Sequence, residues 1–146
     1  MRRRLLLVAL AAALLAVPAS SATVLPGFRS PSGNIMCLSL PGPPAFLWCN
    51  IEKSNYSKKL IAYCAQPRIG VDWVGFTLGV KSKGSIECSG GAMYDSGTQH
   101  PHVVTLPYRK TWHSGKFTCL SQSAGVTCRN PAGHGLFVSR QSYRVF

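Results

Sequence analysis

The stretch Ser32-Gly33-Asn34-Ile35-Met36-Cys37-Leu38-Ser39 recurs in outline as Ser114-Gly115-Lys116-Phe117-Thr118-Cys119-Leu120-Ser121. A third, shorter copy of the glycine, apolar residue and cysteine runs from Gly84 through Ile86 to Cys88. In every copy the cysteine follows the apolar residue by two places, which is the side-chain period of a β-strand with one buried face. The repeat therefore predicts strands that carry their cysteines toward the core.

The sequence contains six cysteines, and we expect three disulfides because the chain is small and begins with the export signal described below. Each long copy of the repeat is followed by a second predicted strand whose cysteine has the same inward phase. Neighbouring antiparallel strands bring such side chains within disulfide reach. A zinc site is the alternative, but the sequence has no C-x-x-C. The predicted pairs are Cys37–Cys49, Cys119–Cys128 and, by exclusion, Cys64–Cys88.

The first residues are typical of an export signal. Three arginines at positions 2–4 precede an apolar run at 5–17, and small residues follow at 20–22, where a signal peptidase cuts. The apolar run is 13 residues long, shorter than the roughly 20 that a spanning helix needs. We expect residues 1–22 to be a cleaved signal peptide, with an uncleaved anchor as the alternative. Residues 23–146 then form a single secreted domain, extracellular or periplasmic, without a membrane span.

The remainder of the sequence predicts short strands between turns. Three prolines among residues 41–44 require a loop, residues 72–80 alternate as a strand, and residues 89–101 predict the longest exposed loop. Residues 52–66 are ambiguous, although a short helix fits them. Short strands at near-even spacing predict an all-β fold, a small antiparallel sandwich or barrel cross-linked by three disulfides. A threefold β-trefoil ranks lower because the middle repeat matches over only five residues.

The net charge favours acidic partners. Without residues 1–22 the chain has 13 lysines and arginines against four acidic residues, a charge of +9. Outside a cell, such an excess attracts polyanions such as nucleic acid, cell-wall polymers or anionic lipid, and it repels basic proteins. The cations are scattered along the sequence, so a solvated basic surface without a specific partner is the alternative.

Catalytic patterns are weak. The four acidic residues suggest no facing pair for glycoside hydrolysis, G-x-S-x-G is absent, and six paired cysteines leave no free thiolate. His100 and His102, with His113 or Asp95, could ligate a metal, but the spacing specifies no third ligand. We therefore predict neither a metal nor another cofactor.

The strongest enzyme hypothesis is a small basic ribonuclease, whose chemistry needs an acid, a base and a cation at the phosphate, and His113, His134 and Lys116 could supply them. Nothing in their spacing requires this arrangement.

A binding surface has better support. Tyr108-Arg109-Lys110-Thr111-Trp112-His113 alternates aromatic and cationic side chains, as surfaces that stack sugars or bases do. The alternative is that Tyr108 and Trp112 pack inward while the cations face water. His134 lies between two glycines, which permit close approach of the backbone. The candidate binding residues are Tyr108, Arg109, Lys110, Trp112 and His134.

Several segments of the chain together carry a resemblance to a known family. They are Phe28-Arg29-Ser30-Pro31-Ser32-Gly33-Asn34-Ile35-Met36-Cys37, Asp72-Trp73, Leu106-Pro107-Tyr108, Gly125-Val126-Thr127-Cys128-Arg129-Asn130, Gly133-His134-Gly135 and Ser139-Arg140. These segments resemble a family of small exported bacterial proteins of unknown function. The chain differs from the family pattern at Arg109, where the family has glycine, and at Leu136, where the family has phenylalanine. The resemblance implies a secreted, disulfide-linked domain and no known activity.

The sequence thus predicts an exported, non-catalytic binding or structural module, with a polyanion or a cell-envelope polymer as its expected ligand. A secreted, ribonuclease-like phosphodiester hydrolase is the alternative. Neither the identity of the ligand nor the oligomeric state follows from the sequence.

Overall fold

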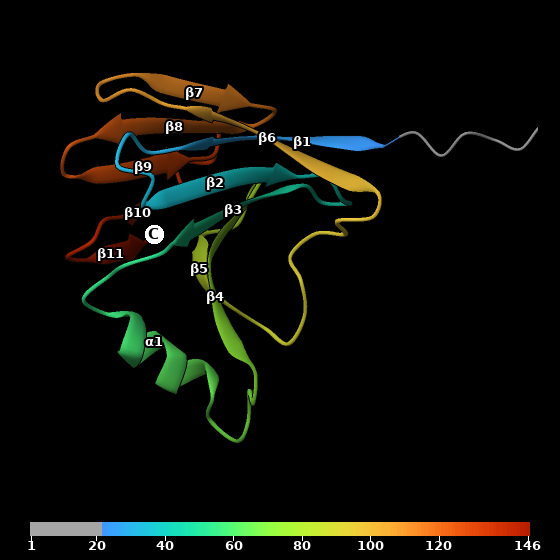
Figure 1. Cartoon of the computed structure of the whole chain (residues 1–146), viewed down its shortest axis with the longest axis vertical. Helices are drawn as coiled ribbons and strands as arrows, with labels where there is room; N and C mark the ends of the chain where they lie inside the picture. Colours follow the sequence, from blue (N-terminus) through green and yellow to red (C-terminus); the bar gives the residue numbers. More distant parts are fainter. Residues whose placement is uncertain (1–21) are drawn as a thin grey trace, which may run out of the picture.

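A computed structural model describes residues 22–146 as two β-sheets packed face to face, with one short helix beside them (Figure 1). The first sheet has the strand order β5-β4-β3-β2-β1-β6, and the second has the order β11-β10-β9-β8-β7. The elements are β1 (Thr23–Arg29), β2 (Ile35–Leu40), β3 (Phe46–Ile51), α1 (Ser57–Cys64), β4 (Asp72–Gly79), β5 (Gly84–Ser89), β6 (Gln99–Thr105), β7 (Thr111–Ser114), β8 (Phe117–Gln122), β9 (Gly125–Arg129), β10 (Gly135–Val138) and β11 (Tyr143–Val145).

Each sheet is built from one continuous part of the chain. The first sheet lies within residues 23–105, the second lies within residues 111–145, and the chain passes between them once. All strand pairs are antiparallel except β1 with β6, which is parallel. The predicted all-β sandwich is confirmed, and the sheets form neither a closed barrel nor a trefoil.

The main core lies between the sheets, and two of the three disulfides lie within it. Cys37 and Cys49 are directly opposite each other on β2 and β3, with Cα atoms 4.1 Å apart. Cys119 and Cys128 are opposite each other on β8 and β9 at 4.0 Å. The sulfurs of Cys37, Cys49 and Cys128 all lie within 4.8 Å of one another, so the disulfides of the two sheets are in contact. With Cys64–Cys88, the three observed disulfides are the predicted ones.

A second apolar cluster lies on the outer face of the first sheet. Leu25, Leu38, Leu40 and Trp48 form it, and part of the loop between β5 and β6 packs against it. The prediction of an exposed loop over residues 89–101 is therefore partly wrong. Its end is the start of β6, which pairs with β1, and the sequence offered no sign of this partner because the two strands are about 70 residues apart along the chain.

A β-bulge in β4 turns the side chain of Trp73 toward the main core. Strict alternation predicts Trp73 on the face opposite Phe76, but the register shifts between Trp73 and Gly75. As a result, Trp73 packs against the main core, with its ring centroid 5.7 Å from that of Phe76. The carbonyl of Val74 at the bulge accepts a hydrogen bond from Trp48 Nε1 at 2.9 Å. Such an extra residue breaks the two-residue period, so alternation alone could not predict it.

Helix α1 falls in the segment that the sequence left ambiguous. It is attached to the first sheet by the Cys64–Cys88 disulfide and by buried Leu60. No helix within residues 22–146 has the length and apolarity to cross a membrane. The predicted signal peptide lies, except for its last residue, outside the described residues.

Candidate functional site

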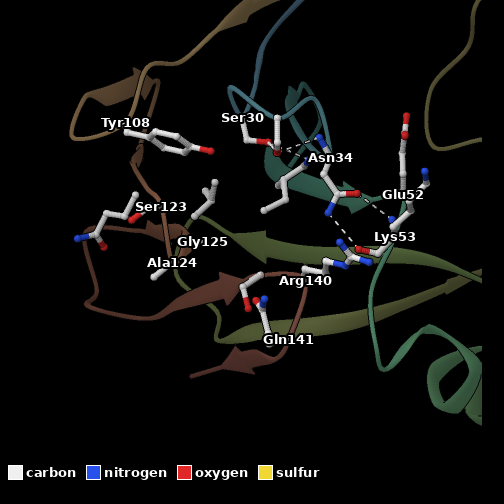
Figure 2. A pocket seen from close by; sticks show the side chains of 15 residues that line it. Ser30, Asn34, Glu52, Lys53, Tyr108, Ser123, Ala124, Gly125, Arg140 and Gln141 are labelled. Atoms are coloured by element: carbon white, nitrogen blue, oxygen red, sulfur yellow. Dashed lines mark hydrogen bonds between the residues drawn. The ribbon is translucent and has the colours of Figure 1, made fainter.

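A cleft of about 380 Å³ opens at one end of the sandwich (Figure 2). Three turns meet there: β1–β2 at residues 30–34, β8–β9 at residues 123–124 and β10–β11 at residues 139–142. The chain leaving β3 and the side chain of Tyr108 complete the walls. Segments from both ends of the described chain therefore form one concave site, as many binding sites do.

Hydrogen bonds hold the wall formed by the β1–β2 turn. The side chain of Asn34 accepts a hydrogen bond from the Lys53 N–H at 2.9 Å and donates one to the Lys53 carbonyl at 3.0 Å. The Glu52 N–H donates to the Asn34 carbonyl at 3.0 Å. Within the turn, Ser30 Oγ accepts from the Ile35 N–H at 3.1 Å. This wall is consequently fixed before any ligand arrives.

The opposite wall is fixed through its backbone. The Asn55 N–H donates to the Arg140 carbonyl, and the buried hydroxyl of Tyr56 donates to the Ser139 carbonyl, both at 2.9 Å. Burial raises the pKa of Tyr56 to about 12, so this hydroxyl remains a donor at physiological pH. The backbone of Arg140 is thus held in place while its exposed side chain faces the cleft (Figure 2).

The groups around the cleft suit a polar ligand that carries negative charge. Arg140 and Lys53 are its cations, and Glu52 is its one acidic residue. The exposed hydroxyl-bearing ring of Tyr108 faces them from the other side (Figure 2). Guanidinium groups bind carboxylates and phosphates through paired hydrogen bonds. Further polar lining comes from Gln122, Ser123 and Gln141.

Two of the candidate binding residues adjoin Tyr108, and a third turns away. Arg109 and Lys110 are exposed in the same turn, but neither lines the cleft. Trp112 is half-buried and packs on Phe28, with ring centroids 5.0 Å apart. Trp112 therefore packs inward, as the alternative interpretation of residues 108–113 expects. Tyr108 is the one aromatic residue of this segment that remains exposed.

His134 lies away from the cleft, in the turn between β9 and β10. Its N–H donates to Asn130 Oδ1 at 3.1 Å and its carbonyl accepts from the Asn130 N–H at 3.0 Å, so its backbone belongs to the turn. His113 lies on β7, where Nδ1 is 3.1 Å from Thr118 Oγ1. The strand register places His113 three strand spacings from Gly135, the residue next to His134. At about 4.8 Å per spacing, this distance is roughly 14 Å.

A second hollow, of about 450 Å³, lies on the outer face of the first sheet. It contains one carboxylate, Glu87, which accepts a hydrogen bond from Thr77 Oγ1 at 2.9 Å. Ser85 Oγ lies 2.8 Å from the same hydroxyl. The only acid of this hollow is thus already engaged, which makes the cleft the better candidate site.

Within residues 22–146, one close group of three potential metal ligands occurs, namely the sulfurs of Cys37, Cys49 and Cys128. All three belong to disulfides, so they offer no thiolate to an ion. His100 and His102 lie on β6 and belong to no such group.

Asn34, Lys53 and Arg140 line the cleft but are not predicted as site residues by the sequence. A signal was nevertheless present, because most of the lining comes from the segments that resemble a known family. The first and the last of those segments lie more than 100 residues apart along the chain. Only the strand pairing shows that they meet.

Fold and cleft together define a disulfide-linked β-sandwich whose turns form a polar cleft at one end. The chain belongs to the family of unknown function DUF6636, whose sequence profile matches residues 9–146, and the resemblance seen in the sequence is thereby confirmed. No curated protein and no solved structure matches the chain.

Proposed function

We propose that this protein is an exported, non-catalytic module that binds a polyanionic polymer of the cell envelope. The main support for this proposal is the charge of residues 106–146, which comprise the second sheet and the segment that leads into it. Residues 106–146 contain six lysines and arginines and no acidic side chain. All four acidic residues lie in the part that forms the first sheet, where seven lysines and arginines offset them. The positive field is therefore concentrated on one side of the sandwich.

The outer face of the second sheet holds two of these cations on one aromatic ring. The guanidinium carbons of Arg129 and Arg144 lie 4.8 and 5.0 Å from the ring centroid of Phe146. Cation–π contacts at this distance orient both groups. Because the side chains are already ordered, a phosphate or carboxylate that binds them costs less conformational entropy.

The cleft suits the repeating units of such a polymer. Hydroxyl and amide groups that line it can bind sugar or polyol hydroxyls, while Arg140 and Lys53 meet the negative groups. The hydrolase alternative has less support, since no histidine lines the cleft and His113 and His134 are about three strand spacings apart.

The first experiment measures binding of the oxidised protein to poly(glycerol phosphate) across a salt series, with single-stranded RNA as a second probe. We expect the logarithm of the binding constant to fall linearly with the logarithm of salt concentration, as release of counterions requires. Each phosphate contact contributes about 0.7 to 0.9 to the magnitude of that slope. The double variant Arg129→Gln/Arg144→Gln, which removes two contacts, should therefore reduce it by about 1.4 to 1.8.

The double variant Lys58→Gln/Lys59→Gln is the matched control, because it removes the same charge from α1. Its slope should stay close to that of the wild type. The proposal fails if the wild type does not bind at low salt, or if both double variants reduce the slope equally. Cleavage of the RNA would favour the hydrolase instead.

A further inference from the structure

Residues 57–70, which we term the helical tip, project from the two sheets (Figure 1). The tip comprises α1 and the turn that follows it, and only Leu60 and Cys64 are buried within it. These two residues lie four positions apart, so they form the one face of the helix that contacts the sandwich. The remainder of the tip is in solvent or partly so.

Apolar side chains are concentrated on this exposed part. Ile61 is 50%, Tyr63 45% and Ile69 36% exposed. They make up half of the six large apolar side chains that are exposed within residues 22–146, yet they lie within nine consecutive residues. Ile61 and Tyr63 are two positions apart on α1, so they flank the buried face on opposite sides of the helix and meet a common partner only at the end of the tip, where the helix passes into the turn that carries Ile69. Scattered exposed apolar residues are ordinary, whereas a group of them at one projecting end indicates a contact surface.

The same segment is purely cationic. Between Glu52 and Asp72 the sequence contains four basic residues and no acidic one. Three of them, Lys58, Lys59 and Arg68, belong to the tip and are exposed. Exposed apolar side chains among lysines and arginines are typical of segments that lie in the interface of an anionic membrane.

Covalent and backbone bonds fix the shape of the tip. The Cys64–Cys88 disulfide links the end of α1 to β5, and the Val71 N–H donates to the Cys64 carbonyl at 3.1 Å. In the turn, the Gln66 carbonyl accepts from the N–H groups of Ile69 and Gly70 at 2.8 and 2.7 Å. The tip is therefore preformed, and docking would not have to order it.

We propose that the helical tip docks on the surface of an anionic lipid bilayer. Ile61, Tyr63 and Ile69 enter the headgroup region, and the neighbouring cations contact lipid phosphates. A soluble polyanion would satisfy the charges but would offer no apolar phase to two isoleucines, which is why a bilayer fits the tip better. The proposal is independent of the polymer-binding function, because it uses a different part of the surface.

Sedimentation with vesicles tests this proposal, using the oxidised protein and vesicles of equimolar phosphatidylglycerol and phosphatidylcholine. The wild type should sediment with them and should bind pure phosphatidylcholine far more weakly. Ile61→Ser/Ile69→Ser should lower the partition constant by about tenfold or more, because it removes the apolar surface that enters the bilayer. Lys58→Gln/Lys59→Gln should lower it by about fivefold per lysine.

Two control variants separate docking by the tip from general effects. Val24 and Val104 are exposed apolar residues on β1 and β6, at 61% and 44%, so Val24→Ser/Val104→Ser removes similar surface elsewhere. It should leave vesicle binding unchanged, and Arg129→Gln/Arg144→Gln should reduce it much less than the lysine variant does. Absence of sedimentation by the wild type, undiminished binding by Ile61→Ser/Ile69→Ser, or an equal loss in the valine control would overturn the proposal. Melting temperatures of all variants establish that they are folded.

Discussion

At the scale of single residues, the buried side chain of Tyr56 connects parts of the molecule that are far apart in the sequence. Tyr56 precedes α1, and its hydroxyl donates to the Ser139 carbonyl 83 residues later in the chain. Its ring lies 4.9 Å from that of Tyr143 and 6.3 Å from that of Phe76. One side chain thus links the helix, the first sheet and the turn that carries Arg140.

We expect Tyr56→Phe to lower the free energy of unfolding by about 1–2 kcal/mol, because the Ser139 carbonyl loses its buried donor. Chemical denaturation measures this difference. The pKa of Tyr56 is raised in the folded state, so its contribution is complete below pH 10 and is lost as the pH rises toward about 12. The gap between wild type and variant should therefore narrow above pH 10, and a constant gap would contradict this account.

The backbone of Arg109 is strained, and a substitution by glycine can measure the cost of that strain. Its φ is 66°, in the left-handed region that favours glycine. We expect Arg109→Gly to raise the free energy of unfolding by about 1 kcal/mol, since it removes a strain of that order. Lys110→Gly is the control: the same new residue at the next position should be destabilising. A loss of stability in Arg109→Gly would show that the side chain stabilises the turn.

At the scale of elements, the alternation of apolar residues predicts strands well and their partners poorly. The cysteine repeat predicted β2, β3, β8 and β9, and hence two of the disulfides, because each pair is joined by a short connection. It could not predict that β6 pairs in parallel with β1 or that β4 contains a bulge. The parallel pairing joins strands about 70 residues apart along the chain. The bulge lies between strands that are neighbours in the chain, and it breaks the two-residue period on which the prediction depends.

The same limit applies to the cleft. Tyr108 was recognised because it lies next to cations in the sequence. Asn34 and Arg140 were not, because their significance comes from the meeting of the β1–β2 and β10–β11 turns. Local patterns identify side chains with suitable chemistry, whereas the strand order decides which of them are neighbours.

Removing the disulfide that anchors the helical tip should have a local effect. Cys64 and Cys88 are 24 positions apart in the sequence, and the chain-entropy relation gives about 3 kcal/mol for a loop of this length. We expect Cys64→Ser/Cys88→Ser to lose protection against hydrogen exchange first in α1 and the following turn, while β8 and β9 retain theirs. Mass spectrometry of peptides can follow both regions. Equal loss of protection everywhere would mean that the tip and the sandwich unfold together.

At the scale of the whole molecule, the proposed activities lie on different parts of the surface. The outer face of the second sheet carries Arg129 and Arg144, the cleft lies at one end of the sandwich, and the helical tip projects from the first sheet. The charge variants should therefore separate the two kinds of binding. Arg129→Gln/Arg144→Gln should weaken polymer binding much more than vesicle binding, and Lys58→Gln/Lys59→Gln should do the reverse.

The order of the disulfides along the chain has a further consequence. Cys37–Cys49 and Cys64–Cys88 close loops within the first sheet and its helix, Cys119–Cys128 closes one within the second, and none connects the two. A single proteolytic cut in the exposed stretch 107–110 would leave two fragments with no covalent bond between them. Each fragment would keep a whole sheet and its own cross-links. Because the backbone at residues 107–110 is the one covalent connection between the two sheets, the two halves of the protein are suited to separate synthesis and reassembly.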